Sequence, residues 1–283
     1  MRGGYNPTRR NRNIGTAKQG HRKNSKFKIP AICNYERIWW EQLARHKNVQ
    51  RYIAGRNLLF IVEATRTDYF HCCTMDDICQ LLALVPSTDW EGLETFVLRQ
   101  PTHKQAVLKP AWGRLAYSAN FGRPGQKSIF AGPALIIEAQ NPDKAISWSV
   151  SLDPDDQAEI ERLKADGHQV IKKGSRLLLH STLDVIRKTQ LYRTVLHEIG
   201  HWVDWLEKVV RPSEKDSANT EKIENAYFAR PQQERETFAH RYATQMRERL
   251  ITSGKMPFER IISRESVLQN GLRIQDFFSE EES

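Results

Sequence analysis

The sequence predicts an α+β fold, in which a mixed sheet is followed by a helical half. Short apolar segments bounded by turn residues are concentrated between about residues 55 and 180. Two long segments with helical periodicity follow, at 181–210 and 232–250. No internal repeat is visible, and 283 residues suffice for a substantial core in one or two domains.

The first half of the chain contains the strands and three shorter helices. The predicted strands are residues 57–63, 93–99, 114–121, 133–139 and 146–152, with a strand or hairpin at 169–180. The predicted helices are residues 35–54, 74–84 and 154–167. We expect the strand at 146–152 to pair with the strand at 133–139 within one mixed sheet.

Local signals support several of these boundaries. Thr74 can cap the helix that follows it, because acidic residues occupy its first turn. Gly167 is a typical stop for the charged helix before it. Residues 122–125 are rich in turn formers, and Lys172-Lys173-Gly174 predicts the turn of the hairpin at 169–180.

Residues 181–210 predict one long amphipathic helix. Ser181 or Thr182 can cap it with Asp184 in the first turn, and Gly200 is its one interior glycine. We expect Arg211-Pro212 to end it, because proline disrupts a helix interior. The apolar stripe that marks its buried face consists of Leu191, Val195, Ile199, Leu206 and Val210.

The same helix carries the motif HExxH, formed by His197, Glu198 and His201. Two histidines four residues apart lie on one helix face, so both imidazoles can reach one zinc ion at about 2.0–2.1 Å. Glu198 projects beside them, where it can accept a proton from a water polarised by the metal. Residues 202–207 lack the glycine and the third histidine of the metzincin motif.

A catalytic zinc needs a third protein ligand and one open position. We expect this ligand from the helix at 232–250, where Glu236 lies on a face lined by small residues that permits close approach to the first helix. Glu234 is the second choice, and Glu224, in an earlier helical stretch, is the third. The alternative for each acid is a solvated surface charge.

These residues together resemble a known family. The segment 196–204, LHEIGHWVD, followed by ETFA at 236–239 and Tyr242-Ala243, resembles the gluzincin zinc metallopeptidases. More narrowly, it is similar to the zinc domain of the anthrax lethal factor-like group. The resemblance covers about residues 181–250, a quarter of the chain. It implies a zincin-type helical half that binds Zn²⁺ through His197, His201 and Glu236, with Glu198 as general base.

The resemblance also implies that a tyrosine near the third ligand stabilises the tetrahedral intermediate. Tyr227 occupies roughly that place, and Tyr192 and Tyr242 are competing candidates. Asp204 is expected either to hydrogen-bond a ligand imidazole and fix its tautomer or to be a surface aspartate. The implied reaction is hydrolysis of a peptide bond in a protein or peptide substrate.

An extended substrate commonly pairs with an edge strand that precedes the zinc helix in zinc peptidases. Residues 176–180 and 146–152 are the two candidates for that strand. The peptidase helices would span residues 181–275. Residues 29–180 would form either the upper half of the peptidase or a recognition domain.

Composition indicates a soluble globular protein, with 39% hydrophobic and 27% charged residues. No apolar run approaches the length that spans a membrane. The N-terminus lacks an apolar signal region, so we expect a cytoplasmic protein, although non-classical export would leave the same sequence.

The net charge of +9 is concentrated at the N-terminus. Residues 1–28 contain nine Lys or Arg and no acid, which equals the net charge of the whole chain. We expect this basic tail to be disordered, and either to contact nucleic acid or another polyanion weakly or to aid solubility. Residues 276–283 form a short acidic tail at the other end.

Four cysteines, Cys33, Cys72, Cys73 and Cys79, lack the spacing of a zinc module or of a secreted disulfide framework. We expect buried or half-buried free thiols rather than a second metal site with His71.

The sequence therefore favours a zinc-dependent peptidase. One alternative is a nucleic-acid-associated protein in which the zinc site is structural or degenerate. A structural zinc usually has four protein ligands including cysteine, however, and no cysteine lies near the motif. The other alternative is a peptidase that acts on nucleic-acid-bound proteins.

Overall fold

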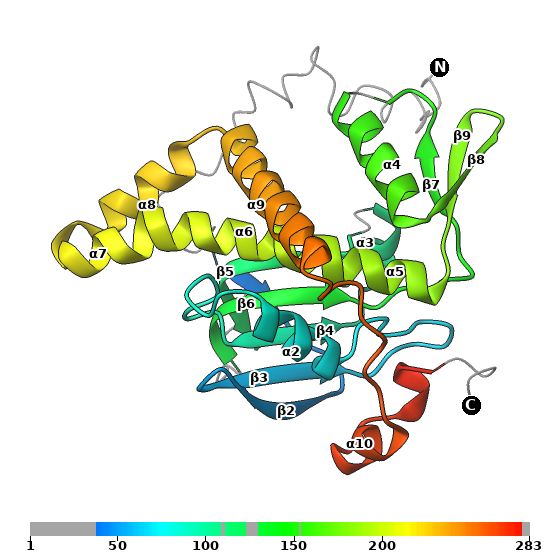
Figure 1. The fold of residues 1–283 in the computed structure, drawn as a ribbon, viewed down its shortest axis with the longest axis horizontal. Helices are drawn as coiled ribbons and strands as arrows, with labels where there is room; N and C mark the ends of the chain where they lie inside the picture. Colours follow the sequence, from blue (N-terminus) through cyan, green and yellow to red (C-terminus); the bar gives the residue numbers. More distant parts are fainter. Residues whose placement is uncertain (1–37, 109–110, 123–129, 153, 279–283) are drawn as a thin grey trace, which may run out of the picture. The chain divides into compact units, whose positions relative to one another are not determined.

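The computed structural model describes residues 38–108, 111–122, 130–152 and 154–278. These belong to one unit, residues 38–283, distinct from residues 1–37. The predicted basic tail, Cys33 and residues 279–283 lie outside the described part. The described part combines helices with a mixed sheet, as the sequence predicts (Figure 1).

The larger sheet has six strands in the order β1-β5-β6-β4-β3-β2. They are β1 (Trp39–Glu41), β2 (His46–Ile53), β3 (Arg56–Glu63), β4 (Thr95–Arg99), β5 (Gly113–Phe121) and β6 (Phe130–Glu138). β4 is parallel to β3 and β6, and β1 is parallel to β5, whereas β2 and β3 are antiparallel, as are β5 and β6. The strands predicted at 57–63, 93–99, 114–121 and 133–139 are confirmed, with small shifts at their ends.

The helix predicted at residues 35–54 is wrong, because β1 and β2 occupy the described part of that segment. β2 lies at the edge of the sheet and pairs with β3 along its whole length. Ala54 and Gly55 join the two strands with φ values of 47° and 79°, as in a two-residue hairpin turn. Pairing with β3 thus outweighs the local helical pattern of a mostly polar edge strand.

The main core lies between the large sheet and the helices that pack on one of its faces. It joins Phe60 and Phe96 of the sheet to α2 (Met75–Leu84) and to Ile199 in the long helical segment. Thr74 caps α2 in a reciprocal capping box with Asp77, as predicted. A smaller apolar cluster covers the opposite face of the sheet.

A second sheet contains three antiparallel strands in the order β7-β9-β8. It consists of β7 (Ile146–Ser149), β8 (Gln169–Lys173) and β9 (Arg176–His180), next to α4 (Pro154–Asp166) (Figure 1). The predicted hairpin at 169–180 and the helix at 154–167 are confirmed. The short helix α3 (His103–Leu108) connects β4 to β5.

Two predictions about this region are wrong. Residues 146–149 pair with β9 rather than with β6, because β6 already has β4 and β5 as its two neighbours. The segment 176–180 is the central strand of its sheet, so it has no free edge for a substrate. The apolar alternation of a strand does not specify its partner.

The helix predicted at 181–210 is a continuous helical segment with two π-helical turns. Thr182 caps its start, as predicted. The segment consists of α5 (Leu183–Thr189), η3 (Gln190–Val195), α6 (Leu196–Trp205), η4 (Leu206–Val210) and α7 (Arg211–Lys215). The predicted end at Arg211-Pro212 is wrong, because the helical segment continues through Pro212 to Lys215. The turn before Pro212 is bonded in the π pattern, from the Arg211 N–H to the Leu206 carbonyl, so the proline interrupts no regular α-helical turn.

The remaining elements are η5 (Ser217–Asn219), α8 (Thr220–Ala229), α9 (Gln232–Thr252), α10 (Arg264–Gln269) and η6 (Ile274–Asp276). α9 confirms the helix predicted at 232–250. Asp276 is buried and accepts hydrogen bonds from the backbone N and Oγ1 of Thr65, both at 2.9 Å. Because Asp276 and Phe277 are buried, the start of the predicted acidic tail belongs to the fold instead.

A buried ion pair joins α2 to α5. Arg187 donates from Nε and Nη2 to the carboxylate of Asp77, at 3.0 and 2.8 Å. Asp77 is fully buried and also accepts the backbone N–H of Ile261 at 2.9 Å. One carboxylate therefore fixes three segments that are far apart in the sequence.

Cys72 and Cys73 are buried and Cys79 is half-buried, all as free thiols, as predicted. Among the described residues, no helix is both long and apolar enough to cross a membrane.

Stability should fall below neutral pH because of His168, which lies between the small sheet and α5. Its Nδ1 and Nε2 are 2.6 Å from Ser181 Oγ and 2.8 Å from Thr189 Oγ1, and burial lowers its pKa to about 4. The unfolded chain, with an ordinary histidine pKa near 6.5, then binds more protons than the folded one as the pH falls from 6.5 to 4. The lowered pKa of His168 should therefore reduce the free energy of unfolding by up to about 3 kcal/mol as the pH falls over that range.

The measurement is urea unfolding at pH 7.0 and 4.5 for the natural protein and His168→Asn. The variant should lose less stability on acidification than the natural protein does. An identical loss in both proteins would contradict the assignment.

Candidate metal centre

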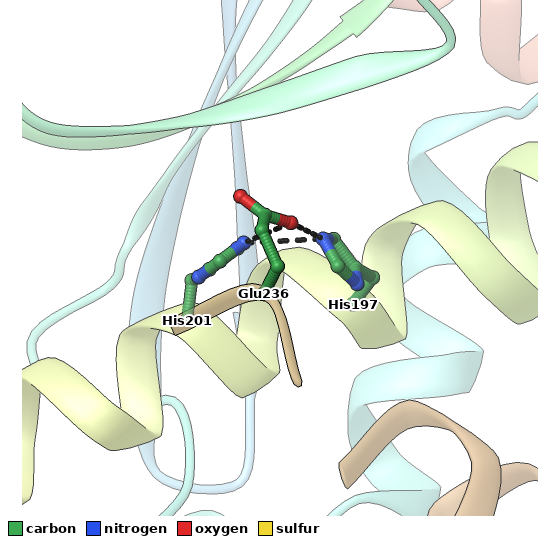
Figure 2. A group of neighbouring side chains, drawn as sticks. All are labelled: His197, His201 and Glu236. Atoms are coloured by element: carbon green, nitrogen blue, oxygen red, sulfur yellow. Dashed lines mark hydrogen bonds and ion pairs between the residues drawn. The ribbon is translucent and has the colours of Figure 1, made fainter. Parts of the chain in front are cut away.

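α6 directs both histidines of the HExxH motif toward one point. The Nε2 atoms of His197 and His201 are 3.1 Å apart, and Oε2 of Glu236, from α9, lies 3.3 Å from the first and 3.5 Å from the second (Figure 2). All three side chains, called the metal group below, are half-buried. Of the residues that the structure describes, this group has the composition and spacing to hold a metal ion.

The spacing of these atoms fits a tetrahedral metal. Ligand atoms about 2.0–2.1 Å from zinc lie about 3.3–3.4 Å from one another in tetrahedral geometry. The three separations, 3.1, 3.3 and 3.5 Å, lie around that value. Two imidazole nitrogens and one carboxylate oxygen are also a ligand set that catalytic zinc accepts. The residues present therefore fit a zinc ion.

Close packing of α6 on α9 places Glu236 beside the histidines. Gly200 lies in the middle of the motif, and a Cβ added there would come within 2.9 Å of the Cα of Ala239. It would also lie 3.0 Å from the Ala239 carbonyl oxygen and 3.1 Å from Cβ of Tyr242. The small residues that suggested close approach in the sequence do meet, and this contact brings the third side chain to the site.

The three groups perturb one another's protonation. The hydrogen bonds from His197 and His201 hold the pKa of Glu236 far below its ordinary value, against the opposing effect of burial. Burial alone would lower the pKa of His201, but the carboxylates of Glu236 and Glu198 raise it above its ordinary value. The centre is therefore an anionic carboxylate facing two imidazoles, which suits a divalent cation.

Glu198 faces a pocket of about 300 Å³ that opens beside the three groups. Its Oε2 accepts a hydrogen bond from the backbone N–H of Leu115, in β5, at 2.8 Å. The pocket is lined by Arg114, Leu115, Tyr117, His197, Glu198, His201, Gln232, Arg235 and Glu236. The motif glutamate is thus held next to the metal group without joining it.

β5 supplies one wall of this pocket and leaves part of its edge open. One edge pairs with β6, whereas the other pairs with β1 only at residues 119–121. Among the described residues, no strand pairs with that second edge between residues 113 and 118. The free edge that lines this pocket is therefore in β5. β7, within the predicted segment 146–152, also lies at the edge of its sheet, but its residues do not line the pocket.

The pocket-lining tyrosine is Tyr117, which was not among the predicted candidates. Its hydroxyl is 3.0 Å from that of Tyr227, which is buried behind it and does not line the pocket. Tyr192 bonds the backbone of Phe258, and Tyr242 bonds Asp89, so both hydroxyls are engaged elsewhere. Burial raises the pKa of Tyr117 to about 12, so its hydroxyl keeps its proton at neutral pH.

The other acids singled out in the sequence lie outside the metal group. Asp204 is fully buried, so it is not a surface aspartate, and its carboxylate pairs with Arg230 at 2.7 Å rather than with a ligand imidazole. Among the described residues, the Nδ1 atoms of His197 and His201 have no hydrogen-bond partner. Glu234 is exposed and lies 3.6 Å from Arg230. Neither Glu234 nor Glu224 lines the pocket.

Two arginines also line the pocket without having been predicted. Arg114 comes from β5, about 80 positions before the motif, and Arg235 immediately precedes the third metal-group residue. Strand residues such as Arg114 carry no sequence signal that relates them to the HExxH helix. Arg235 could have been found, because its neighbour Glu236 was already a candidate.

No protein-family model, no curated protein and no solved structure matches this chain.

Proposed function

We propose that this chain is a zinc-dependent peptidase with a gluzincin-type, zincin-like helical half, similar to the zinc domain of the anthrax lethal factor-like group. The observation that carries the proposal is the triangle formed by His197, His201 and Glu236, with Glu198 beside it. The ligand spacing and the position of a second, non-coordinating carboxylate, that of Glu198, are what hydrolysis by a metal-activated water requires.

A zinc ion bound by these three residues would supply a water acidified to a pKa near 7 and would polarise the substrate carbonyl. Glu198 accepts the proton of that water and passes it to the leaving amine, acting first as base and then as acid. The N–H of Leu115 holds Glu198 in place before the substrate arrives.

Tyr117 takes the role of oxyanion donor in this proposal, in place of Tyr227. Its protonated hydroxyl lines the pocket, whereas Tyr227 reaches the pocket only through it. Tyr227 would orient Tyr117 through the hydroxyl contact at 3.0 Å. Such a donor stabilises charge that develops in the transition state.

The open edge of β5 supports an extended substrate. Its residues 113–118 run past His197, His201 and Glu236. The N–H of Leu115 is engaged by Glu198, and the other outward N–H and C=O groups of this edge can pair with a peptide backbone. Added-strand pairing would bring the scissile carbonyl to Glu198 while the pocket receives a side chain. A protein or peptide is therefore the proposed substrate class.

The experiment that tests the metal centre is zinc content per chain for the natural protein, Glu236→Ala, Glu234→Ala and Glu198→Gln. We expect about one zinc per chain in the natural protein, Glu234→Ala and Glu198→Gln. Glu236→Ala should lose zinc, with a fall in zinc affinity larger than the roughly 10- to 100-fold fall typical of mutating a residue that only hydrogen-bonds a ligand. Glu234→Ala is the matched control, because it removes a carboxylate from the same helix. Equal zinc in Glu236→Ala, or none in the natural protein, would refute the proposal.

A further inference from the structure

Arg235 is a charged residue of the pocket that the mechanism above does not use. Its side chain lies over the rings of Tyr227 and Phe228, with its guanidinium carbon 5.6 and 5.7 Å from their centroids. Among the described residues, no carboxylate lies within ion-pair distance of Arg235, and its buried Nε has no hydrogen-bond partner. An arginine held against aromatic rings with unsatisfied donors is suited to a ligand that brings its own acceptors.

The second pocket arginine is already neutralised. Arg114 forms a short ion pair with Glu138 and stacks over Trp39, at 4.9 Å from its centroid. Glu138 also pairs with Arg99, which in turn pairs with Glu41. This network holds two arginines and two glutamates, so it adds no net charge to the pocket.

The remaining charges around the pocket do not cancel once a divalent ion is bound. Glu198 and Glu236 together balance such an ion, and neither acid pairs with Arg235. One positive charge is left over, on Arg235.

We propose that Arg235 binds a carboxylate of the substrate next to the scissile bond, so that the pocket selects acidic peptides. The inference rests on the proposed peptidase function. The carboxylate could belong to an aspartate or glutamate side chain, which fits an endopeptidase, or to the C-terminus of the substrate, which fits a carboxypeptidase. A guanidinium fork binds either one through two parallel hydrogen bonds.

The test measures binding rather than hydrolysis, with zinc-loaded full-length Glu198→Gln as the bait. One probe is a random octapeptide library with acetylated N-termini and amidated C-termini. The other is a library without Asp and Glu, offered with free and with amidated C-termini. Binding takes place at about 150 mM salt, which screens loose electrostatic attraction to residues 1–28. The bound peptides are then sequenced by mass spectrometry.

Enrichment of Asp and Glu over Asn and Gln at one position of the first library would identify a side-chain carboxylate. Retention of free over amidated termini in the second would identify a C-terminal carboxylate. In either case, we expect the selected peptide to bind about 10- to 100-fold tighter than its amide counterpart. Introducing Arg235→Gln into the Glu198→Gln bait should reduce this affinity ratio to near one, and Arg235→Lys in its place should restore part of it.

Arg241→Gln is the matched control, because Arg241 is an exposed arginine of the same helix outside the pocket. Zinc content, measured for each variant, shows whether the metal centre has survived. No preference for carboxylates, or a preference that Arg235→Gln leaves intact, would overturn the inference. If the natural protein hydrolyses peptides without that preference, the inference about Arg235 fails and the proposed peptidase function stands. If acidic peptides are selected but none is hydrolysed, the proposed peptidase function fails and Arg235 remains a carboxylate-binding residue.

Discussion

Glu198→Gln should abolish most of the peptidase activity while leaving the zinc in place. The amide has the shape of the carboxylate and can still accept the N–H of Leu115, so the pocket should keep its form. It cannot accept the proton of the attacking water, however, and a positioned general base contributes roughly 10²- to 10⁴-fold to a rate. We therefore expect a loss of kcat of that size.

The measurement is cleavage of a peptide mixture, followed by mass spectrometry, with zinc content determined on the same samples. Glu234→Gln is the control, because it makes the same chemical change on an exposed residue of α9. Equal cleavage by Glu198→Gln and the natural protein would exclude Glu198 as the base. Loss of zinc in Glu198→Gln would instead assign it a structural part in the metal centre.

Arg187→Met should destabilise the fold by about 3–5 kcal/mol, the cost of leaving one member of a buried ion pair uncompensated. Asp77 is fully buried, so water cannot replace the two hydrogen bonds that Arg187 donates. Because Asp77 also binds the backbone at Ile261, the loss should loosen the C-terminal segment as well as α2 and α5.

The measurement is urea unfolding of Arg187→Met beside Lys188→Met, its neighbour in the same helix. Lys188 pairs with Asp184 on an exposed surface, so its removal should cost less than about 1 kcal/mol. The double variant Arg187→Met with Asp77→Asn should lose less unfolding free energy than the two single variants lose in sum. Strict additivity would show that the two side chains do not act as a pair.

The residues of the site that lie on two helices could be predicted from the sequence. HExxH has a spacing that is itself a helix turn, and the small residues near Glu236 indicate where a second helix can approach. The wall formed by β5 could not be predicted. Leu115 and Tyr117 reach the pocket only because their strand lies beside α6, and no local pattern encodes that placement.

The errors in the fold have the same origin. β2 has a polar sequence that resembles a helix, and it becomes a strand because β3 offers a complete edge to pair with. β7 has the alternation of a strand, but its partner is chosen by which edges remain open. Both outcomes depend on distant segments, whereas the cap at Thr74 depends on three neighbouring residues and was predicted correctly.

Under the proposed function, the contact between Gly200 and Ala239 would couple metal binding to the unfolding equilibrium. His201 and Glu236 are far apart along the chain, and only the packed pair of helices brings them together. An ion that binds the packed pair and not the unfolded chain stabilises the fold by mass action, about 2.7 kcal/mol at a free concentration one hundred times its dissociation constant. Under the proposed function, the concentration of free metal is therefore one of the variables that set the folded fraction of this protein.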